Sequence, residues 1–134
     1  MKKGQKHFIC GGALGIDQMA FMVCKKLRDQ GYDIIIEVAV PFKNQPIKWN
    51  MESQELYNKQ LLAADIITYV DTLDMYSTNI PDGLFDRNKL MNRNKYMIDN
   101  SDVLIAVWDG SPSGTKHAID YAKEKNKEVI IVNI

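Results

Sequence analysis

Short apolar runs alternate with segments of helical periodicity along the chain, and this alternation constrains the fold more than any other feature. The clearest run extends from Asp33 to Val40, contains two triplets of apolar residues and stops at Pro41. A nearly continuous, β-branched run of this kind is typical of a strand that is covered on both faces of a parallel sheet. We therefore predict a strand here, with helices on both sides of its sheet.

The remaining elements follow the same order. We predict strands at residues 7–10, 33–40, 65–70, 102–108 and 128–134, and helices at about residues 16–30, 53–64, 84–100 and 115–126. The first helix is indicated by apolar residues at helical spacing (Ile16, Met19, Ala20, Val23 and Leu27), and the second by Tyr57, Leu61 and Ala64 behind a Ser53 cap. Strands that alternate with helices indicate right-handed β-α-β units. The predicted fold class is α/β, a Rossmann-like and mostly parallel sheet with flanking helices.

Length and composition place the chain among ordinary globular domains. Its 134 residues are 46% apolar and 25% charged, which predicts one domain over residues 1–134. Lys plus Arg and Asp plus Glu are both 17, so no net charge attracts nucleic acid or an anionic membrane. No apolar run reaches the roughly 18 residues of a membrane span. Cys10 and Cys24 are too few for a disulfide scaffold, and we expect a soluble cytoplasmic protein with reduced thiols.

Two loops are candidates for anion binding. In open α/β sheets, ligands bind beyond the carboxyl ends of the strands, which directs attention to loops 11–15, 41–52, 71–83 and 109–115. The first glycine loop is Gly11-Gly12-Ala13-Leu14-Gly15 and the second is Gly110-Ser111-Pro112-Ser113-Gly114-Thr115. Backbone N–H groups at a helix start favour phosphate, whereas a tight turn with positive φ explains the same glycines without a ligand. Neither loop is G-x-G-x-x-G or a P-loop, so a standard dinucleotide or ATP site is not indicated.

Polar residues interrupt the apolar stripe of the helix before the second glycine loop. Arg93 lies three residues after Leu90 and four before Met97, and Asn94 lies next to it. A guanidinium on a core-facing stripe must be paired, and its planar fork fits a carboxylate or a phosphate. Two alternatives stay open: Arg93 extends past the stripe into solvent, or it pairs with an internal acid such as Asp65 or Asp102.

Further loop residues are candidates for contacts with a planar base or a ribose. Phe42, Gln45, Trp49 and Tyr76 are suited to stacking or hydrogen bonding, although a hydrophobic cluster under the loops explains Phe42 and Trp49 equally well. Asp17 and Asp109 are the candidates for a general base or a ribose-hydroxyl contact. The favourable interaction of a carboxylate with the helix dipole explains Asp17 without any function. Asp109 is explained equally well as an ordinary acidic residue of a loop.

No metal site or cofactor is predicted. His7 and His117 lack a second ligand at metal-binding spacing, and no nucleophile elbow is present. Ser113 is better explained as a helix cap than as a nucleophile.

The combination of these segments resembles the YpsA-like branch of the SLOG superfamily, which also includes DprA (Smf) and the Lonely Guy phosphoribohydrolases. The resemblance covers residue 7 to the end of the chain. The segments that carry it are residues 11–18, Pro41-Phe42 with Gln45 and Trp49, Tyr76-Ser77, Arg93-Asn94, and the run from Ala106 through Trp108 to Thr115. Their ordered combination is more specific than any one of them alone.

The resemblance implies a pocket for a nucleotide or a nucleotide-derived ligand, such as an ADP-ribose-type signal, in a bacterial or phage protein. It places the two glycine loops on phosphate or ribose, and it implies the following ligand-binding set: Gly11, Gly12, Ala13, Leu14, Asp17, Pro41, Phe42, Gln45, Trp49, Tyr76, Arg93, Asn94, Trp108, Asp109, Gly110, Ser111, Ser113, Gly114 and Thr115.

The chain departs from the family pattern in two ways. The Lonely Guy proteins carry a glutamate that assists glycosidic cleavage, and Ala118 occupies its place here, so that Asp17 or Asp109 would have to replace it. Family members also usually begin with a further strand and helix at the centre of the sheet. We therefore expect an open sheet edge and a homo-oligomer in which a partner chain supplies the missing wall.

Three functions follow from this reasoning. The first is a binding module that senses or sequesters a nucleotide-like small molecule. The second is an enzyme that hydrolyses the N-glycosidic bond of a nucleoside 5′-monophosphate, with Arg93 on the phosphate. The third, single-strand DNA binding as in DprA, is disfavoured by the zero net charge.

Overall fold

Two parallel sheets make up the framework of the molecule. The computed structural model describes residues 6–12 and 15–133. The first sheet has the order β1-β2-β3 and contains β1 (Lys6–Gly11), β2 (Ile34–Val40) and β3 (Ile66–Tyr69). The second pairs β4 (Val103–Trp108) with β5 (Glu128–Asn133), in parallel. The α/β class and the parallel strands are thus confirmed.

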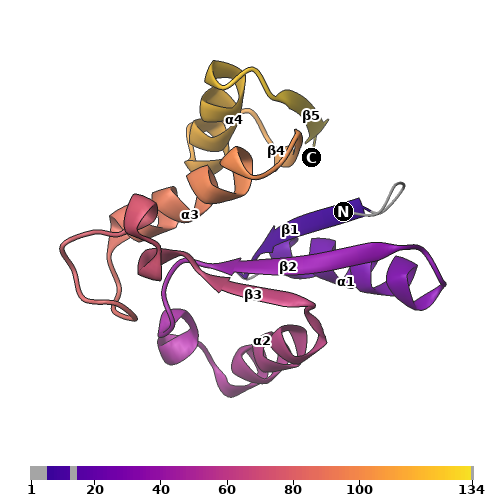
Figure 1. Ribbon diagram of the computed structural model, residues 1–134, viewed down its shortest axis with the longest axis horizontal. Coiled ribbons are helices and arrows are strands. Elements are labelled where there is room, and N and C mark those ends of the chain that lie inside the picture. Colours follow the sequence, from indigo (N-terminus) through magenta and orange to yellow (C-terminus); the bar gives the residue numbers. More distant parts are fainter. Residues whose placement is uncertain (1–5, 13–14, 134) are drawn as a thin grey trace.

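The helices flank these sheets (Figure 1). α1 (Ile16–Asp29) and α2 (Met51–Ala63) lie on one side of the first sheet, and α3 (Arg87–Asp99) lies on the other. α4 (Gly114–Glu124) packs against α3 and both strands of the second sheet. α3 therefore connects the two sheets. Three short 3₁₀ helices, at Gln45–Lys48, Val70–Thr72 and Asp74–Tyr76, lie in the loops.

The division into two sheets differs from the single sheet that the alternation of elements suggests. β1 and β4 are the strands that would have to join the sheets, and among the described residues neither is hydrogen-bonded to the other. The resemblance places a further strand at the centre of the sheet. A backbone ladder requires directly adjacent strands, so β4 and β5 form a sheet of their own.

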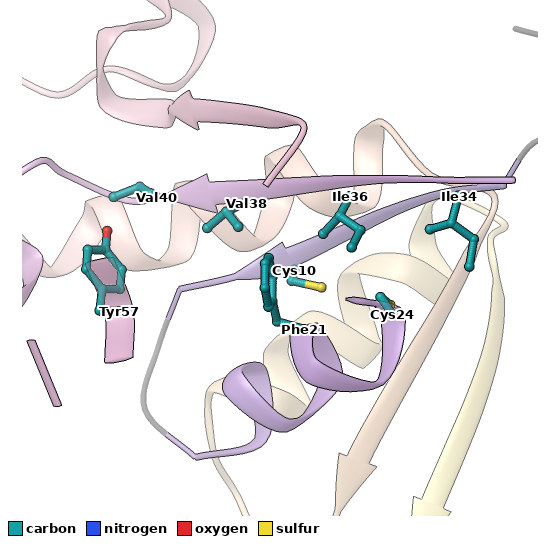
Figure 2. Packing of buried hydrophobic residues seen from close by; sticks show 8 residues of the cluster. All are labelled: Cys10, Phe21, Cys24, Ile34, Ile36, Val38, Val40 and Tyr57. Carbon is teal, nitrogen blue, oxygen red and sulfur yellow. The ribbon is translucent and has the colours of Figure 1, made fainter. Parts of the chain in front are cut away.

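The main core lies between β2 and the two helices α1 and α2 (Figure 2). Ile36, Val38 and Val40 point toward Phe21 of α1 and Tyr57 of α2. The intervening β2 residues, Glu37 and Ala39, are buried on the opposite face, where α3 packs. β2 is therefore covered on both faces, as the apolar run predicts.

Glu37 is a buried carboxylate with a full set of donors. It accepts hydrogen bonds from His7 Nε2 (2.9 Å), Thr68 Oγ1 (2.9 Å) and Tyr96 Oη (2.5 Å). Burying a charge is costly unless it is hydrogen-bonded. These contacts tie β1, β3 and α3 to the middle of β2.

The face of α1 that packs against the sheet is not the face whose apolar spacing predicts the helix. Phe21 and Cys24 are buried against the sheet. A stripe of apolar side chains, which we call the α1 stripe, is instead exposed: Ile16 (47%), Met19 (64%), Met22 (52%) and Val23 (59%). The periodicity predicts the helix correctly but not the side that meets the sheet, because α1 has two apolar faces.

The structure confirms the predicted cap of one helix and corrects that of another. Ser113 caps α4, since its hydroxyl accepts from Lys116 N. α2 begins earlier than expected, because Asn50 rather than Ser53 is its cap and accepts from Ser53 N at 2.7 Å. None of the helices in the described part of the chain has the length and apolar character that a membrane crossing requires.

Candidate functional site

Gly11 and Gly12, at the carboxyl end of β1, pass closer to other side chains than any larger residue could. A Cβ on Gly11 would lie 2.7 Å from Asp17 Oδ2 and 2.8 Å from Arg93 Nη1, and one on Gly12 would lie 2.9 Å from Tyr57 Cε1. Neither glycine has a positive φ. Close approach, and not a tight turn, is therefore the reason for glycine at both positions.

Arg93 reaches this turn from α3. Its side chain is buried, with the residue 7% exposed, and contacts the carboxyl ends of β1 and β2. Nε donates to Asn94 Oδ1 at 3.0 Å, and Nη1 makes a long bond of 3.5 Å to the carbonyl of Ala39. Burial lowers the pKa of the Arg93 guanidinium, whereas the nearby Asp17 carboxylate opposes this shift. An arginine stays charged in such a setting, so the turn carries a buried positive charge.

Asp17 is the carboxylate of this group. It lies in the first turn of α1, is half-buried, and has its Oδ2 atom against Gly11. The acid near Arg93 is therefore Asp17, and Asp65 binds elsewhere, to Arg28 Nη1 and to Ile36 N at 2.8 Å each. The start of α1 has Gly15 as its cap residue, with φ of 87° and no side-chain cap.

The segment after β2 supplies one polar contact and two aromatic packing residues. Gln45 Nε2 donates to the carbonyl of Gly12 at 3.1 Å. Phe42 is buried edge-to-face on Phe85 with ring centroids 5.7 Å apart, and Trp49 stands edge-to-face on Tyr57 at 5.3 Å. Pro41 is fully buried before them. Trp49 thus packs against the main core, as the hydrophobic-cluster explanation states, whereas Phe42 packs on Phe85.

The second glycine turn is a self-contained hydrogen-bonded loop. Asp109 Oδ1 accepts from Ser111 N (2.9 Å) and Ser111 Oγ (2.5 Å), and Trp108 Nε1 donates to the Ser111 carbonyl (2.7 Å). The hydrogen bonds from Ser111 lower the pKa of Asp109. Gly110 has a φ of 92°, so a tight turn does explain glycine at this position.

A cavity of about 280 Å³ lies between α3 and the start of α4. Its lining includes Asn94, Gly114, His117, Ala118 and Tyr121. Gly114 faces open space, and Thr115 beside it is half-buried. Asn94, which lines this cavity, also accepts a hydrogen bond from Arg93.

Tyr76 is placed away from the first glycine turn. Its hydroxyl donates to Asp99 Oδ2 at 2.5 Å and its ring stands edge-to-face on Tyr96. Tyr121 donates to the other oxygen of Asp99 at 2.7 Å, and burial together with Asp99 raises the pKa of Tyr121 to about 12. We therefore leave Tyr76 out of the site proposed below. Ala13 and Leu14 lie outside the described residues.

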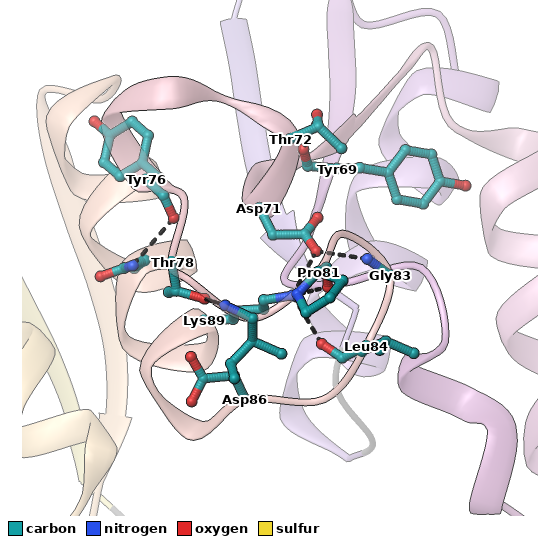
Figure 3. Close-up of polar contacts among 12 residues, drawn as sticks. Tyr69, Asp71, Thr72, Tyr76, Thr78, Pro81, Gly83, Leu84, Asp86 and Lys89 are labelled. Carbon is teal, nitrogen blue, oxygen red and sulfur yellow. Dashed lines mark hydrogen bonds and ion pairs between the residues drawn. The ribbon is translucent and has the colours of Figure 1, made fainter.

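A buried ion pair anchors the long loop that precedes α3 (Figure 3). Lys89 Nζ donates to Asp71 Oδ2 (3.0 Å) and to the carbonyls of Pro81 (2.8 Å) and Leu84 (2.9 Å), and Gly83 N donates to the same carboxyl oxygen (2.9 Å). Both side chains are almost completely buried. The sequence gives no signal for this pair, because its members belong to different elements and look like ordinary surface charges.

Tyr57 is the residue at the first glycine turn that sequence reasoning missed. Its spacing with Leu61 identifies it as a core residue, and its ring is in fact buried. Its hydroxyl, however, has no hydrogen-bond partner. Among the described residues no group of three or more His, Cys, Asp and Glu side chains is placed to hold a metal ion.

Comparison with known proteins identifies the family. A family model described as the YspA SLOG family (YpsA) matches residues 1–133. An uncharacterized SPbeta prophage-derived protein, YoqJ of Bacillus subtilis, is 40% identical over 124 residues, which are 92% of this chain and 72% of the relative. UPF0398 proteins from Halalkalibacterium halodurans and Bacillus cereus are 26% and 28% identical, over 96% and 95% of this chain.

The chain therefore belongs to the YpsA family of SLOG proteins, which confirms the resemblance seen in the sequence. It spans slightly less than two thirds of the two UPF0398 relatives, 64% and 65% of their lengths.

Proposed function

We propose that this chain binds a nucleotide or a nucleotide-derived signalling ligand, such as an ADP-ribose-type molecule, in order to sense or sequester it. The observation that carries the proposal is the buried Arg93 guanidinium beside Gly11. A buried cation next to glycines that bring backbone close to it is suited to a phosphate. Membership of the SLOG family supports a small-molecule role.

In this proposal the first glycine turn binds the phosphorylated ribose, and the α3–α4 cavity receives another part of the ligand. Gly11, Gly12, Asp17, Gln45, Arg93 and Asn94 form the inner site, and Gly114 with Thr115 at the start of α4 borders the cavity. Residues 1–134 act as one domain. A cytoplasmic protein without bound metal or cofactor, and without nucleic acid as partner, fits a ligand of this kind.

Hydrolysis of a nucleoside 5′-monophosphate is the second candidate function. Asp17 favours it, because a carboxylate next to the phosphate-binding arginine is placed to stabilise a developing ribosyl cation. Ala118 weighs against it, because it lines the cavity where the enzymatic relatives carry their glutamate. Asp109 is committed to Ser111 in an exposed turn, so Asp17 is the better candidate of the two.

Native mass spectrometry followed by chromatography separates the two functions. The purified protein is incubated with a panel of nucleotides that includes adenosine monophosphate and ADP-ribose. Binding predicts a complex whose ligand is recovered intact. Release of free base indicates the glycosidase, and the absence of any complex or product contradicts both functions.

We also propose that the chain works as a homo-oligomer. The support is the exposed α1 stripe and the outer edge of β1, with which no described strand pairs. An unpaired edge strand next to an exposed apolar helix is typical of an interaction surface.

A further inference from the structure

The hydroxyl of Tyr57 is buried at the first glycine turn without a hydrogen bond. Tyr57 is 2% exposed and its ring lies against Gly12, where a Cβ would come within 2.9 Å of Cε1. Figure 2 shows the hydroxyl pointing toward the carboxyl end of β2, near Val40. This is the end of the sheet at which Gly11, Gly12 and Arg93 meet.

Gln45 does not satisfy this hydroxyl. Its amide nitrogen lies near enough to Tyr57 to lower the pKa of the phenol, and it also donates to the Gly12 carbonyl, but as a donor it cannot accept the phenol proton. The phenol proton therefore has no acceptor. A buried polar group without a partner destabilises a fold, and such groups are rare in native proteins.

Two other side-chain donors share this property. Gln18 Nε2 on α1 and Gln60 Nε2 on α2 are also buried without partners. α1 and α2 pack side by side on the same face of the sheet, and Gln18 follows Asp17 directly in the first turn of α1.

We infer that the Tyr57 hydroxyl donates a hydrogen bond to an oxygen atom of the ribose-phosphate part of the ligand, entering over Gly12. The inference rests on the proposed function and adds a specificity-determining residue to it. Burial raises the pKa of Tyr57 to about 12, so the group keeps its proton at neutral pH. Glycine at position 12 leaves the ring and its hydroxyl in place, because a side chain there would displace both.

The substitution Tyr57→Phe tests this inference with two readouts. The melting temperature of the ligand-free protein should stay equal to or rise above that of the wild type, because the lost hydroxyl had no partner. The affinity for adenosine monophosphate and for ADP-ribose, measured by titration calorimetry, should fall about threefold to tenfold. Tyr32→Phe is the matched control, since Tyr32 is exposed and should change neither value.

The outcomes distinguish this inference from the proposed function. A fall of several degrees in the melting temperature of Tyr57→Phe overturns the inference, because it means that the hydroxyl has a structural partner. Equal affinity in Tyr57→Phe and wild type also overturns it and leaves the proposed function intact. A wild type that binds neither nucleotide overturns both.

Discussion

At the scale of single residues, the glycines of the two turns differ in whether their backbone conformation or their surroundings require glycine. Gly11 and Gly12 have ordinary φ values and are crowded by side chains, whereas Gly110 has a φ of 92° and open space around it. Gly114 has no positive φ, and no described side chain lies close to the position that its Cβ would take. The tight-turn explanation therefore holds for Gly110 and fails for Gly11 and Gly12, a distinction that the sequence alone cannot make.

The pair Gly12→Ala and Gly114→Ala tests this distinction. Gly12→Ala should lower the free energy of unfolding by about 1–3 kcal/mol, because the new Cβ would overlap the Tyr57 ring. Gly114→Ala should be neutral or stabilising by up to about 1 kcal/mol, because it adds helix propensity in open space. Chemical denaturation measures both, and an equal loss in the two variants would contradict the assignment.

Arg93 illustrates how far residue-level prediction reaches. Its position on an apolar stripe leaves open whether the side chain is paired inside the fold or extends into solvent, and the structure buries it. Its neighbouring acid is Asp17, however, and not Asp65 or Asp102, since the partner is set by the way α1 and α3 meet at β1. The spacing of residues along one helix does not show which other elements pack against that helix.

At the scale of elements, the sequence predicts the long loop before α3 but not the contacts that hold it. The sequence predicts a loop over residues 71–83, and its length suggests a functional segment. In the structure, Asp71, Pro81 and Gly83 bind Lys89 or each other, so these polar groups hold the loop on α3. The loop is therefore a rigid support at the carboxyl end of β3.

Replacing Lys89 should lower the stability of the fold strongly. Lys89→Met leaves the Asp71 carboxylate buried without its counter-charge, and the free energy of unfolding should fall by about 3–5 kcal/mol in urea denaturation. Lys25→Met, which breaks the exposed Lys25–Asp29 pair, is the control and should cost less than about 1 kcal/mol. Similar losses in both variants would show that the buried pair has no special role.

Asp65 links α1, β2 and the start of β3, and it should make stability depend on pH. Burial opposes its charge, but the hydrogen bonds from Ile36 N and Arg28 outweigh this effect and lower the pKa of Asp65. Its contribution is therefore present above the unfolded pKa of about 3.9 and is lost as pH falls through the lower folded value. Asp65→Asn should flatten the acid side of a melting-temperature profile, and a profile identical to the wild type would contradict this role.

At the scale of the whole molecule, the sequence predicts the order of strands and helices but not their assembly into two sheets. Local patterns specify each strand, whereas the assignment of β4 and β5 to a sheet of their own depends on tertiary packing that no local pattern encodes. The same applies to α1, whose exposed stripe is the least expected feature of the surface.

A charge on the α1 stripe should disrupt the proposed oligomer. Met19→Lys combined with Val23→Lys places charges on exposed positions, so the subunit fold should survive while self-association weakens. Light scattering coupled to size-exclusion chromatography measures the mass, and circular dichroism checks the fold. If wild type and double variant have the same mass, the stripe is not the interface.

The most direct test of the account is a comparison of adenosine monophosphate with adenosine on wild type and Arg93→Ala by titration calorimetry. We expect the wild type to bind the monophosphate and to bind adenosine far more weakly. A folded Arg93→Ala variant should lose about 1.5–3 kcal/mol of binding free energy for the monophosphate alone, because it lacks the charge-assisted bond. Equal binding of the two ligands by the wild type, or unchanged affinity in Arg93→Ala, would contradict a phosphate site at the first glycine turn.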